Sequence, residues 1–375
     1  MIPSHSTSGH RRRPLTPWEL PSLLTPVHIY RRTVKRCKKE RTHFAAILGF
    51  VYRNRFAVAS QIQRRFSSIL RSDRTARRHL EELESLGYLA VAPARGVGPL
   101  FPKVYYVTGR GVRRLKEALT TQDKPWQPSR IDRRARDAKE GYSAEQIIHE
   151  ILITEFMLAV WQTIEGRPDL ELLNIQRRSF TKHSAFRLVV GARSTRLAPD
   201  AMFLFRHKNQ GMCCCFVELD NGTMNAKQLR VKFARYGAWS QSVQGQQYLI
   251  NLYERYGAKE PKPKFRLLMV ARSRTGLDDD GRSAELLKAA EGLTVGMRKQ
   301  IWLTTVAALR EHQHDDHPLD ASVWLRLGDP QCPADPAKNK QQIARNMNHS
   351  LFPGSVPDTH ATKSSSFGSL GSSAP

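Results

Sequence analysis

The sequence predicts an α/β protein with two folded units: a small helical unit that ends in a two-stranded ribbon, and a larger unit built on a mixed sheet. In residues 42–120, apolar side chains repeat at helical spacing and are followed by short strand-like runs. In residues 142–308, a long apolar helix precedes several strands, a second helix and further strands, an order typical of a mixed sheet with helices on its faces. The 375-residue chain is long enough for two such cores.

The charge of the chain indicates the class of its partner. There are 60 Lys and Arg residues against 34 Asp and Glu, a formal net charge of +26. Such an excess favours a polyanion, and nucleic acid is the commonest one. A cationic membrane protein is the alternative, but no apolar run reaches the roughly 18 residues that a span needs, and the N-terminus lacks the apolar core of a signal peptide. The cysteines show neither metal spacing nor an even disulfide framework, so we expect a cytoplasmic protein without membrane association.

Three segments outside the two units have a different composition. Residues 1–41 hold ten Lys and Arg, two acids and five prolines, which predicts a disordered basic arm that contacts phosphates. A solubilising tail is the alternative. Residues 121–141 are polar and basic and are expected to link the two units. Residues 309–375 are polar and end in a Ser/Gly tract, and we expect disorder there as well.

The DNA-binding prediction depends on the third helix of the small unit, which begins after Ser72 and ends at Gly87. Ser72 is a good N-cap, and the apolar residues of one face are Ala76, Leu80, Leu83 and Leu86. Basic side chains fall away from that face, near the N-terminal end. The residues expected to contact DNA are Arg71, Arg74, Thr75, Arg77 and Arg78 at this helix, with Arg95 and Lys103 on the ribbon.

Three helices followed by a ribbon resemble a winged helix-turn-helix domain. The resemblance rests on the segment 83–89, Leu-Glu-Ser-Leu-Gly-Tyr-Leu, and on the later run 104–108, Val-Tyr-Tyr-Val-Thr. In that class the third helix enters the major groove and the wing contacts the backbone. The alternative is a solvated charged helix in a winged helix that binds protein.

The larger unit begins with a helix over 143–163. The pattern then predicts strands near 170–177, 186–190, 200–206 and 212–219, a helix over 225–239, a strand at 265–271, a helix near 283–292 and a strand at 301–306.

Two of these strands bring carboxylates to one edge of the sheet. Asp200, after Pro199, starts one apolar run, and Glu218 and Asp220 end the next. The separation of eighteen residues between Asp200 and Glu218 suits the outward and return strands of a hairpin. A divalent metal could lie between them. The alternative is a pair of acids at the strand ends that form ion pairs with nearby Arg and Lys residues.

The pair Pro199-Asp200 and Glu218-Leu219-Asp220 resembles the signature of the PD-(D/E)XK nucleases. The resemblance implies that Asp200 and Glu218 hold Mg²⁺, together with the Leu219 carbonyl, and that a lysine two residues after Glu218 assists. Asp220 stands there instead, so it is expected to support the metal. A lysine from the following helix, Lys227 or Lys232, is expected to replace the missing one. These two lie five residues apart on different faces, so only one can serve.

The helix over 143–163 supplies two accessory candidates, His149 and Glu155. Glu155 falls on the apolar side, where a carboxylate is costly unless it is paired or bound to metal. Nucleases of this superfamily sometimes take an acid from this helix. Pairing with an arginine is the alternative for Glu155, and capping or packing is the alternative for His149.

The whole arrangement over residues 42–275 resembles the replication-relaxation family of bacterial plasmids and mobile elements. The resemblance rests on the winged helix, on His149, on Pro199-Asp200, on the segment 218–223 (Glu-Leu-Asp-Asn-Gly-Thr) and on 232–236 (Lys-Phe-Ala-Arg-Tyr). It implies a bacterial cytoplasmic protein that binds double-stranded DNA in replication or DNA relaxation, with a Mg²⁺-dependent endonuclease or nickase domain. The alternative is a non-catalytic replication accessory or transcription regulator with a degenerate nuclease fold. Further expected partners are a second copy of the chain or other replication and mobilisation proteins.

Overall fold

The computed structural model describes residues 43–92, 102–120, 142–177, 186–190, 193–261, 264–273, 279–311, 319 and 324–327. The expected basic arm, the linker 121–141, Arg95 and most of the expected C-terminal tail lie outside the described residues.

The small unit consists of helices packed on a short sheet. Its elements are α2 (His43–Asn54), β1 (Ala57–Val58), α3 (Ala59–Arg65), α4 (Asp73–Ser85), β2 (Leu89–Val91), β3 (Val104–Val107) and α5 (Gly109–Thr120). The sheet order is β1-β3-β2, so the two expected strands gain a third that the sequence pattern did not predict. Ser72 caps α4, because its side chain accepts a hydrogen bond from the Thr75 N–H. Gly87 has a φ of +69°, which lets the chain turn directly into β2.

The large unit is a mixed six-stranded sheet with helices on both faces, which confirms the predicted α/β class. Its elements are α7 (Ala144–Gly166), β4 (Leu170–Arg177), β7 (Ala201–His207), β8 (Gly211–Asp220), α8 (Ala226–Gln241), α9 (Val243–Arg255), β9 (Phe265–Ala271), α10 (Asp279–Ala290), α11 (Val295–Arg298), β10 (Ile301–Thr305), α12 (Val306–Glu311) and β11 (Leu325–Arg326). The strand order is β11-β10-β9-β8-β7-β4. Neighbours β4, β7 and β8 are antiparallel, whereas β8, β9 and β10 run parallel.

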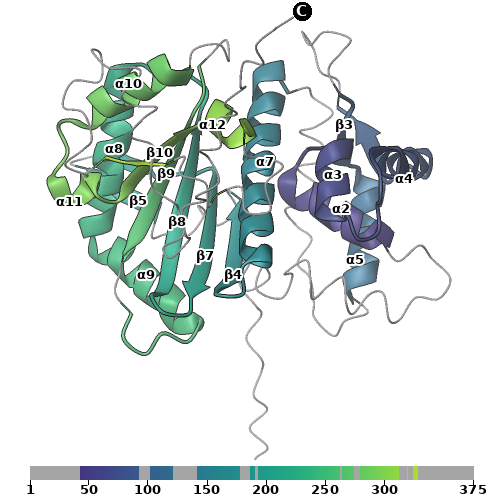
Figure 1. Cartoon of the computed structure of the whole chain (residues 1–375), viewed down its shortest axis with the longest axis horizontal. Coiled ribbons are helices and arrows are strands. Elements are labelled where there is room, and N and C mark those ends of the chain that lie inside the picture. The colour runs from purple at the N-terminus through teal and green to yellow at the C-terminus, as the bar shows by residue number, and fades with distance from the viewer. Residues whose placement is uncertain are drawn as a thin grey trace, which may run out of the picture.

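The two faces of the sheet belong to different cores. Along β8, Cys215, Val217 and Leu219 pack with α7, whereas Cys214 and Phe216 pack with α8 and α9. This alternation is the two-residue period of a strand. Figure 1 shows α7 on one side of the sheet and α8, α9 and α10 on the other. Glu218 and Asp220 continue the second series, so β8 directs them toward α8.

Three parts of the large unit differ from the sequence prediction. The expected strand at 186–190 is β5 (Arg187–Val190), which leaves the central sheet and forms a separate hairpin with β6 (Arg193–Arg196). The pattern does not predict helix α9 as an element of its own. The unit also extends beyond residue 308, because β11 pairs with β10 and Trp324 is fully buried.

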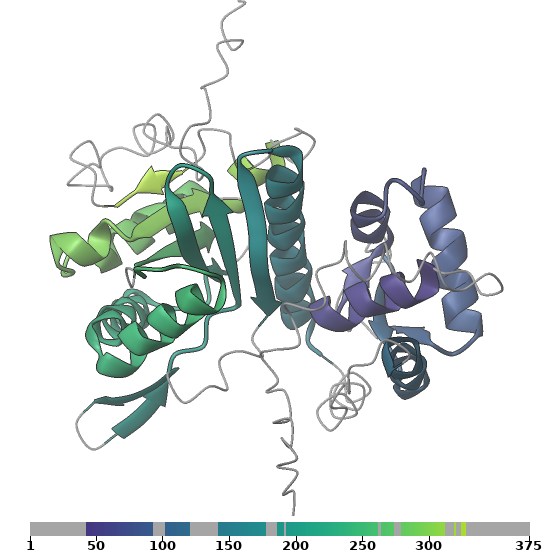
Figure 2. The ribbon, with the colours of Figure 1, turned by 90° about the horizontal axis from the view of Figure 1, so that it is seen from below.

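Helix α7 lies between the sheet and the small unit, as Figures 1 and 2 both show. Phe50 of α2 contacts Trp161, and Arg55, which follows α2, forms an ion pair of 2.9 Å with Glu150. Among the described helices, α7 alone is long and apolar enough to cross a membrane, but most of it is buried in the protein. A helix packed on two sides needs apolar residues all round, so this packing accounts for its composition.

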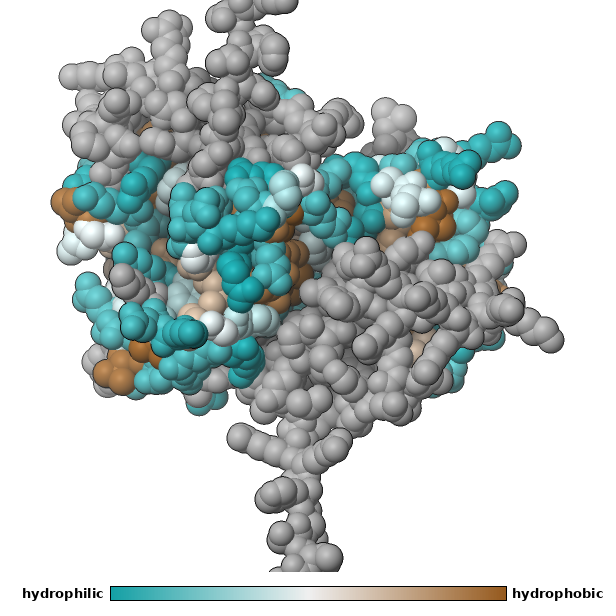
Figure 3. Space-filling view, turned by 60° about the horizontal axis from the view of Figure 1, so that its bottom comes forward, coloured by the Kyte–Doolittle hydropathy of each residue, from teal (hydrophilic) through white to brown (hydrophobic). Residues whose placement is uncertain are grey.

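The described surface is mostly hydrophilic on the face seen in Figure 3, where the hydrophobic patches are small and separated. Among the residues that the structure describes, the exposed large apolar side chains come from separate places in the chain: Leu86, Val231, Val243 and Val295. Scattered residues of this kind are normal on a folded protein.

Candidate functional site

Asp200 is fixed at the start of β7 by the neighbouring strand. Its backbone N–H donates to the Val217 carbonyl (2.9 Å), and its carboxylate Oδ2 accepts from the Leu219 N–H (3.0 Å). These two bonds lie on either side of Glu218, so the Asp200 carboxylate is held beside that residue. Asp200 is only 3% exposed.

Glu218 is held by two side chains from one face of α8. Lys232 Nζ lies 2.8 Å from Oε2, and the Tyr236 hydroxyl donates to Oε1 over 2.6 Å. Lys232 and Tyr236 are four residues apart, one turn of the helix, so both reach the same carboxylate. Of the two lysines considered from the sequence, Lys232 is therefore the one whose amine lies at the acid pair. Lys227 is exposed in the first turn of α8.

The electrostatics of this group follow from its burial. Burial is the largest cause that raises the pKa of Glu218, to about 7; Asp200 raises it further, whereas Lys232 and Tyr236 hold it down. For Lys232, burial acts to lower the pKa, but attraction to Glu218 and Asp200 outweighs it and the pKa rises. Lys232 is therefore a firmly charged ammonium beside two carboxylates. Burial and the neighbouring Glu218 raise the pKa of Tyr236 well above its usual value, so this hydroxyl keeps its proton and remains a donor.

The carboxylate pair has the chemistry of a Mg²⁺ site. Mg²⁺ is usually held in proteins by one or two carboxylates, and waters or phosphate oxygens complete its octahedron. Asp200 and Glu218 supply two buried carboxylates from adjacent strands. A divalent cation would offset the repulsion between them, which adds to the effect of burial in raising the pKa of Glu218. Within the described residues, no cluster of three or more His, Cys, Asp or Glu side chains could hold a metal. The fit is thus to a two-carboxylate site.

Asp220, which the sequence analysis expected to support the metal, binds an arginine in the structure. It is fully buried, and the Arg282 guanidinium of α10 binds it with two hydrogen bonds, one of 3.0 Å from Nη2 to Oδ1 and one from Nε to Oδ2. Arg282 also donates to the Met224 carbonyl (2.7 Å), in the turn before α8. The ion pair thus joins β8, α10 and the start of α8, and both carboxylate oxygens of Asp220 are engaged in it.

His149 connects α7 to Asp200. Its Nε2 lies 3.2 Å from Asp200 Oδ1, and its Nδ1 lies 3.1 Å from the amide nitrogen of Asn221. Because an amide nitrogen only donates, Nδ1 is the acceptor in this arrangement and Nε2 carries the proton that Asp200 accepts. The structure therefore places His149 at the acid pair, on the side opposite α8.

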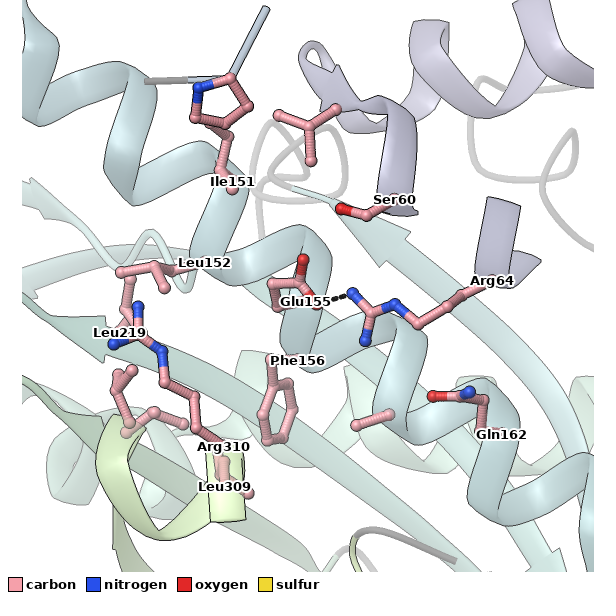
Figure 4. A pocket seen from close by; sticks show the side chains of 15 residues that line it. Ser60, Arg64, Ile151, Leu152, Glu155, Phe156, Gln162, Leu219, Leu309 and Arg310 are labelled. Carbon is pink, nitrogen blue, oxygen red and sulfur yellow. Dashed lines mark hydrogen bonds and ion pairs between the residues drawn. The ribbon is translucent and has the colours of Figure 1, made fainter. Parts of the chain in front are cut away.

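Glu155, the other accessory candidate, lies away from the acid pair. It forms an ion pair with Arg64 of α3 and accepts a hydrogen bond from Gln61 Nε2 (2.9 Å). Figure 4 shows Glu155 pointing toward Arg64 across a pocket between α3 and α7, whose volume is about 310 Å³. Glu155 is therefore paired with an arginine, and the pair joins the small unit to α7.

The residues expected to contact DNA lie on the small unit. Arg71, Arg74, Arg77, Arg78 and Lys103 are exposed, and Thr75 is half-buried. Arg77 forms an ion pair of 2.5 Å with Asp73, one turn before it. The opposite face of α4 is buried through Ala76, Leu80 and Leu83. Leu86, which the sequence pattern predicts on the same face, is instead the C-cap residue and is exposed. The helix thus presents its basic side to solvent at its N-terminal end.

Sequence reasoning missed two residues of the site. The apolar pattern places Tyr236 on the buried face of its helix, although its spacing of four from Lys232 is a signal that it could share a partner with that lysine. Arg282 gave no local signal, because it lies 62 residues from Asp220.

The raised pKa of Glu218 makes the stability of the protein depend on pH. The folded chain keeps a proton between the ordinary value of 4.5 and about 7, whereas the unfolded chain releases it. The free energy of unfolding is therefore expected to fall as the pH rises through this range. Urea unfolding in chelator at about pH 5 and about pH 8 measures the effect. Glu218→Gln, which stays neutral, should flatten this dependence, and an unchanged slope would contradict the assignment.

Comparison with known proteins gives one match. No curated protein and no solved structure is significantly similar to the chain. The model of the family described as replication-relaxation matches residues 48–250, which is more than half of the chain and includes α4, the acid pair and Lys232. The chain belongs to the replication-relaxation family.

Proposed function

We propose that this replication-relaxation protein binds double-stranded DNA of a plasmid or mobile element through its small unit and cleaves a strand with its large unit, using Mg²⁺. The observation that carries the proposal is the convergence of Asp200, Glu218 and Lys232. Lys232 Nζ lies 2.8 Å from Glu218, and the charges of both carboxylates act on it. A buried pair of acids with one ammonium is the combination that metal-dependent phosphodiester cleavage needs.

The order of elements in the small unit supports DNA binding. Helix α2, strand β1, helices α3 and α4 and the pair β2–β3 follow one another as in a winged helix-turn-helix, with β1 as the third strand of the sheet. In that class α4 corresponds to the helix that enters the major groove. Its exposed arginines Arg74 and Arg78 are the side chains best suited to base edges or phosphates.

The large unit supports the nuclease part of the proposal by its order of elements. A helix (α7), three antiparallel strands (β4, β7 and β8), a helix (α8) and a parallel strand (β9) surround the acid pair, an α/β order with a mixed sheet that suits the nuclease-like domain proposed here. Asp200 and Glu218 occupy the acidic positions of the PD-(D/E)XK signature. The signature expects its lysine on the strand, at the position that Asp220 occupies. Here Lys232 of α8 supplies the ammonium instead.

In this mechanism the side chains of the site bind the metal, supply a fixed positive charge and hold one another in place. Asp200 and Glu218 would hold Mg²⁺, which supplies a polarised phosphate oxygen and a water of lowered pKa. Lys232 provides a fixed positive charge beside the place where negative charge grows on the phosphate. Tyr236 fixes Glu218 by its hydrogen bond of 2.6 Å, and His149 fixes Asp200 from α7. Each group is set before the reaction, which is the condition for strong electrostatic stabilisation.

A non-catalytic replication accessory is the second candidate, and one observation favours it. All four carboxylate oxygens of the pair already accept hydrogen bonds or ion pairs, from His149, the Leu219 N–H, Tyr236 and Lys232. Such a network can stabilise the fold by itself. The large unit would then bind or orient DNA and leave it intact.

Supercoiled plasmid distinguishes the two candidates. If the proposal is right, the full-length protein with Mg²⁺ converts supercoiled plasmid to the nicked or linear form, and chelator stops the reaction. Asp200→Asn and Glu218→Gln, which keep the shape of each side chain, should reduce the rate by at least about 10²-fold. DNA that stays intact while it is bound tightly would overturn the nuclease proposal in favour of the accessory.

A further inference from the structure

The β5–β6 hairpin is a basic element that the proposed site does not use. Figure 2 shows it standing out from the body of the large unit, as the teal pair of strands at the lower left. Between Glu171 and Asp200 the sequence contains no acid, and it has six basic residues: Arg177, Arg178, Lys182, Arg187, Arg193 and Arg196. The hairpin thus forms the C-terminal half of a stretch whose charges are all positive and which ends four residues before Asp200.

Two of its arginines stand directly opposite each other. Arg187 and Arg196 are register partners across the antiparallel pair, and both are exposed. Within the described residues, neither forms an ion pair. Like charges at opposed positions destabilise a sheet. A pair of guanidinium groups in this position is therefore poorly explained by stability, and it suits a polyanion that would lie against both.

The base of the hairpin is fixed to α8. Phe186 is fully buried, and its ring stacks on Trp239 with centroids 5.4 Å apart and planes 9° from parallel. Leu197 lies at the same end of the hairpin, where its N–H donates to the Phe186 carbonyl (2.9 Å). The hairpin therefore projects from a rigid support, although its strands are short.

The same helix connects this support to the acid pair. Trp239 lies seven residues after Lys232, which is two turns, so both project from about the same side of α8. The distance along the helix is about 10 Å, close to the axial length of three base pairs. DNA held by the hairpin would then pass within reach of Lys232 and Glu218.

We propose that the β5–β6 hairpin is a second DNA-binding element, in which Arg187 and Arg196 together clamp the phosphate backbone of a duplex next to the Asp200–Glu218 pair. This inference rests on the proposed DNA binding and extends it to a contact outside the winged-helix unit. A two-stranded ribbon can lie in or along a groove of duplex DNA. Arginine pairs recognise phosphate without reading sequence, so the clamp is independent of base sequence.

The test compares the full-length protein with three double variants on a labelled duplex of arbitrary sequence, across a series of salt concentrations. For Arg187→Ala with Arg196→Ala, we expect affinity to fall by about 10- to 30-fold near 0.15 M salt and the slope of log K against log salt to lose about 1.8 units. The matched control is Lys259→Ala with Lys288→Ala, which removes the same charge from exposed positions elsewhere and should stay within about twofold. The third variant, Arg74→Ala with Arg78→Ala, reports on α4.

Thermal unfolding provides an independent readout. Because the opposed arginines repel each other, the hairpin variant should melt no lower than the wild type while it binds DNA more weakly. If it binds as tightly as the lysine control, with the same salt slope, the clamp is overturned. If the wild type itself does not bind the duplex, the proposed DNA-binding function fails as a whole, an outcome that is distinct from the first.

Discussion

Replacing Lys232 with alanine is expected to lower the rate of metal-dependent plasmid cleavage by about 10²- to 10³-fold, the usual effect of removing a preorganised charge from a catalytic site. The ammonium lies 2.8 Å from Glu218, and its side chain is 22% exposed, so solvent screens it weakly. The charge of Asp200 also acts on it. No water molecule could reproduce a fixed positive charge at this place. Single-turnover cleavage of plasmid in Mg²⁺ measures the effect.

Lys227→Ala is the matched control, because it removes the same charge from the same helix. Lys227 is exposed one turn and a half before Lys232, and its variant should cleave within about twofold of the wild type. DNA affinity measured in chelator should change little for either variant, which separates a catalytic loss from a folding loss. Equal rates for the two variants, or a larger loss for Lys227→Ala, would refute the assignment of Lys232.

The sequence predicts best those parts of the fold that depend on residues close together in the chain. The helices of the small unit, the N-cap at Ser72 and the strands at 201–207 and 211–220 follow from apolar spacing and turn chemistry. The opposition of Asp200 and Glu218 also follows, because two adjacent strands joined by a tight turn bring their far ends together. Hence the place of the acid pair follows from the amino-acid sequence alone.

The parts that the sequence did not predict depend on contacts between distant segments. Arg282 lies 62 residues from Asp220, and Gln61 lies 94 residues from Glu155. Nothing in the local pattern tells which of many arginines will meet a given acid. The same limit applies to β5, whose apolar alternation suits either a central strand or a separate hairpin. The pairing of β5 with β6, which the local pattern does not specify, makes it a separate hairpin.

The choice between Lys227 and Lys232 is an intermediate case. Helical spacing places Lys232 next to Tyr236, which is four residues later. Lys227 has no buried polar residue three or four positions away in the helix. A buried tyrosine needs a hydrogen-bond partner, and a glutamate at the end of the adjacent strand provides one. The spacing of Lys232 and Tyr236 therefore indicates Lys232 as the lysine that meets Glu218.

The neighbouring residues His149 and Glu150 show why the two units form one continuous body. His149 points to Asp200 of the sheet, whereas Glu150 is buried between Arg55 of the small unit and Arg177 at the end of β4. One turn of α7 thus supports the acid pair and anchors the small unit at the same time. A buried carboxylate held by two guanidinium groups is costly to disrupt, so the position of the small unit relative to α7 is well defined.

Breaking the Asp220–Arg282 pair is expected to have the largest effect on stability. Both side chains are almost fully buried, so Arg282→Met leaves the Asp220 carboxylate without its main partner in the protein interior. The free energy of unfolding should fall by about 3–5 kcal/mol, a large part of the total for most domains. Urea unfolding measures the loss. Glu285→Gln is the control, because Glu285 binds the same guanidinium but is 60% exposed, and it should cost less than about 1 kcal/mol.

The double variant Asp220→Asn with Arg282→Met separates an ion pair from simple packing. When both charges are removed, no uncompensated charge stays buried, so the double variant should be more stable than Arg282→Met alone. The outcome also tests the role of Asp220. If Asp220 serves the fold through Arg282, the double variant should cleave plasmid at temperatures where it is folded, with Asp200, Glu218 and Lys232 intact. Loss of cleavage in a folded double variant would show that Asp220 acts on the metal or the DNA as well. A double variant no more stable than Arg282→Met would show instead that the ion pair is not what stabilises this part of the fold.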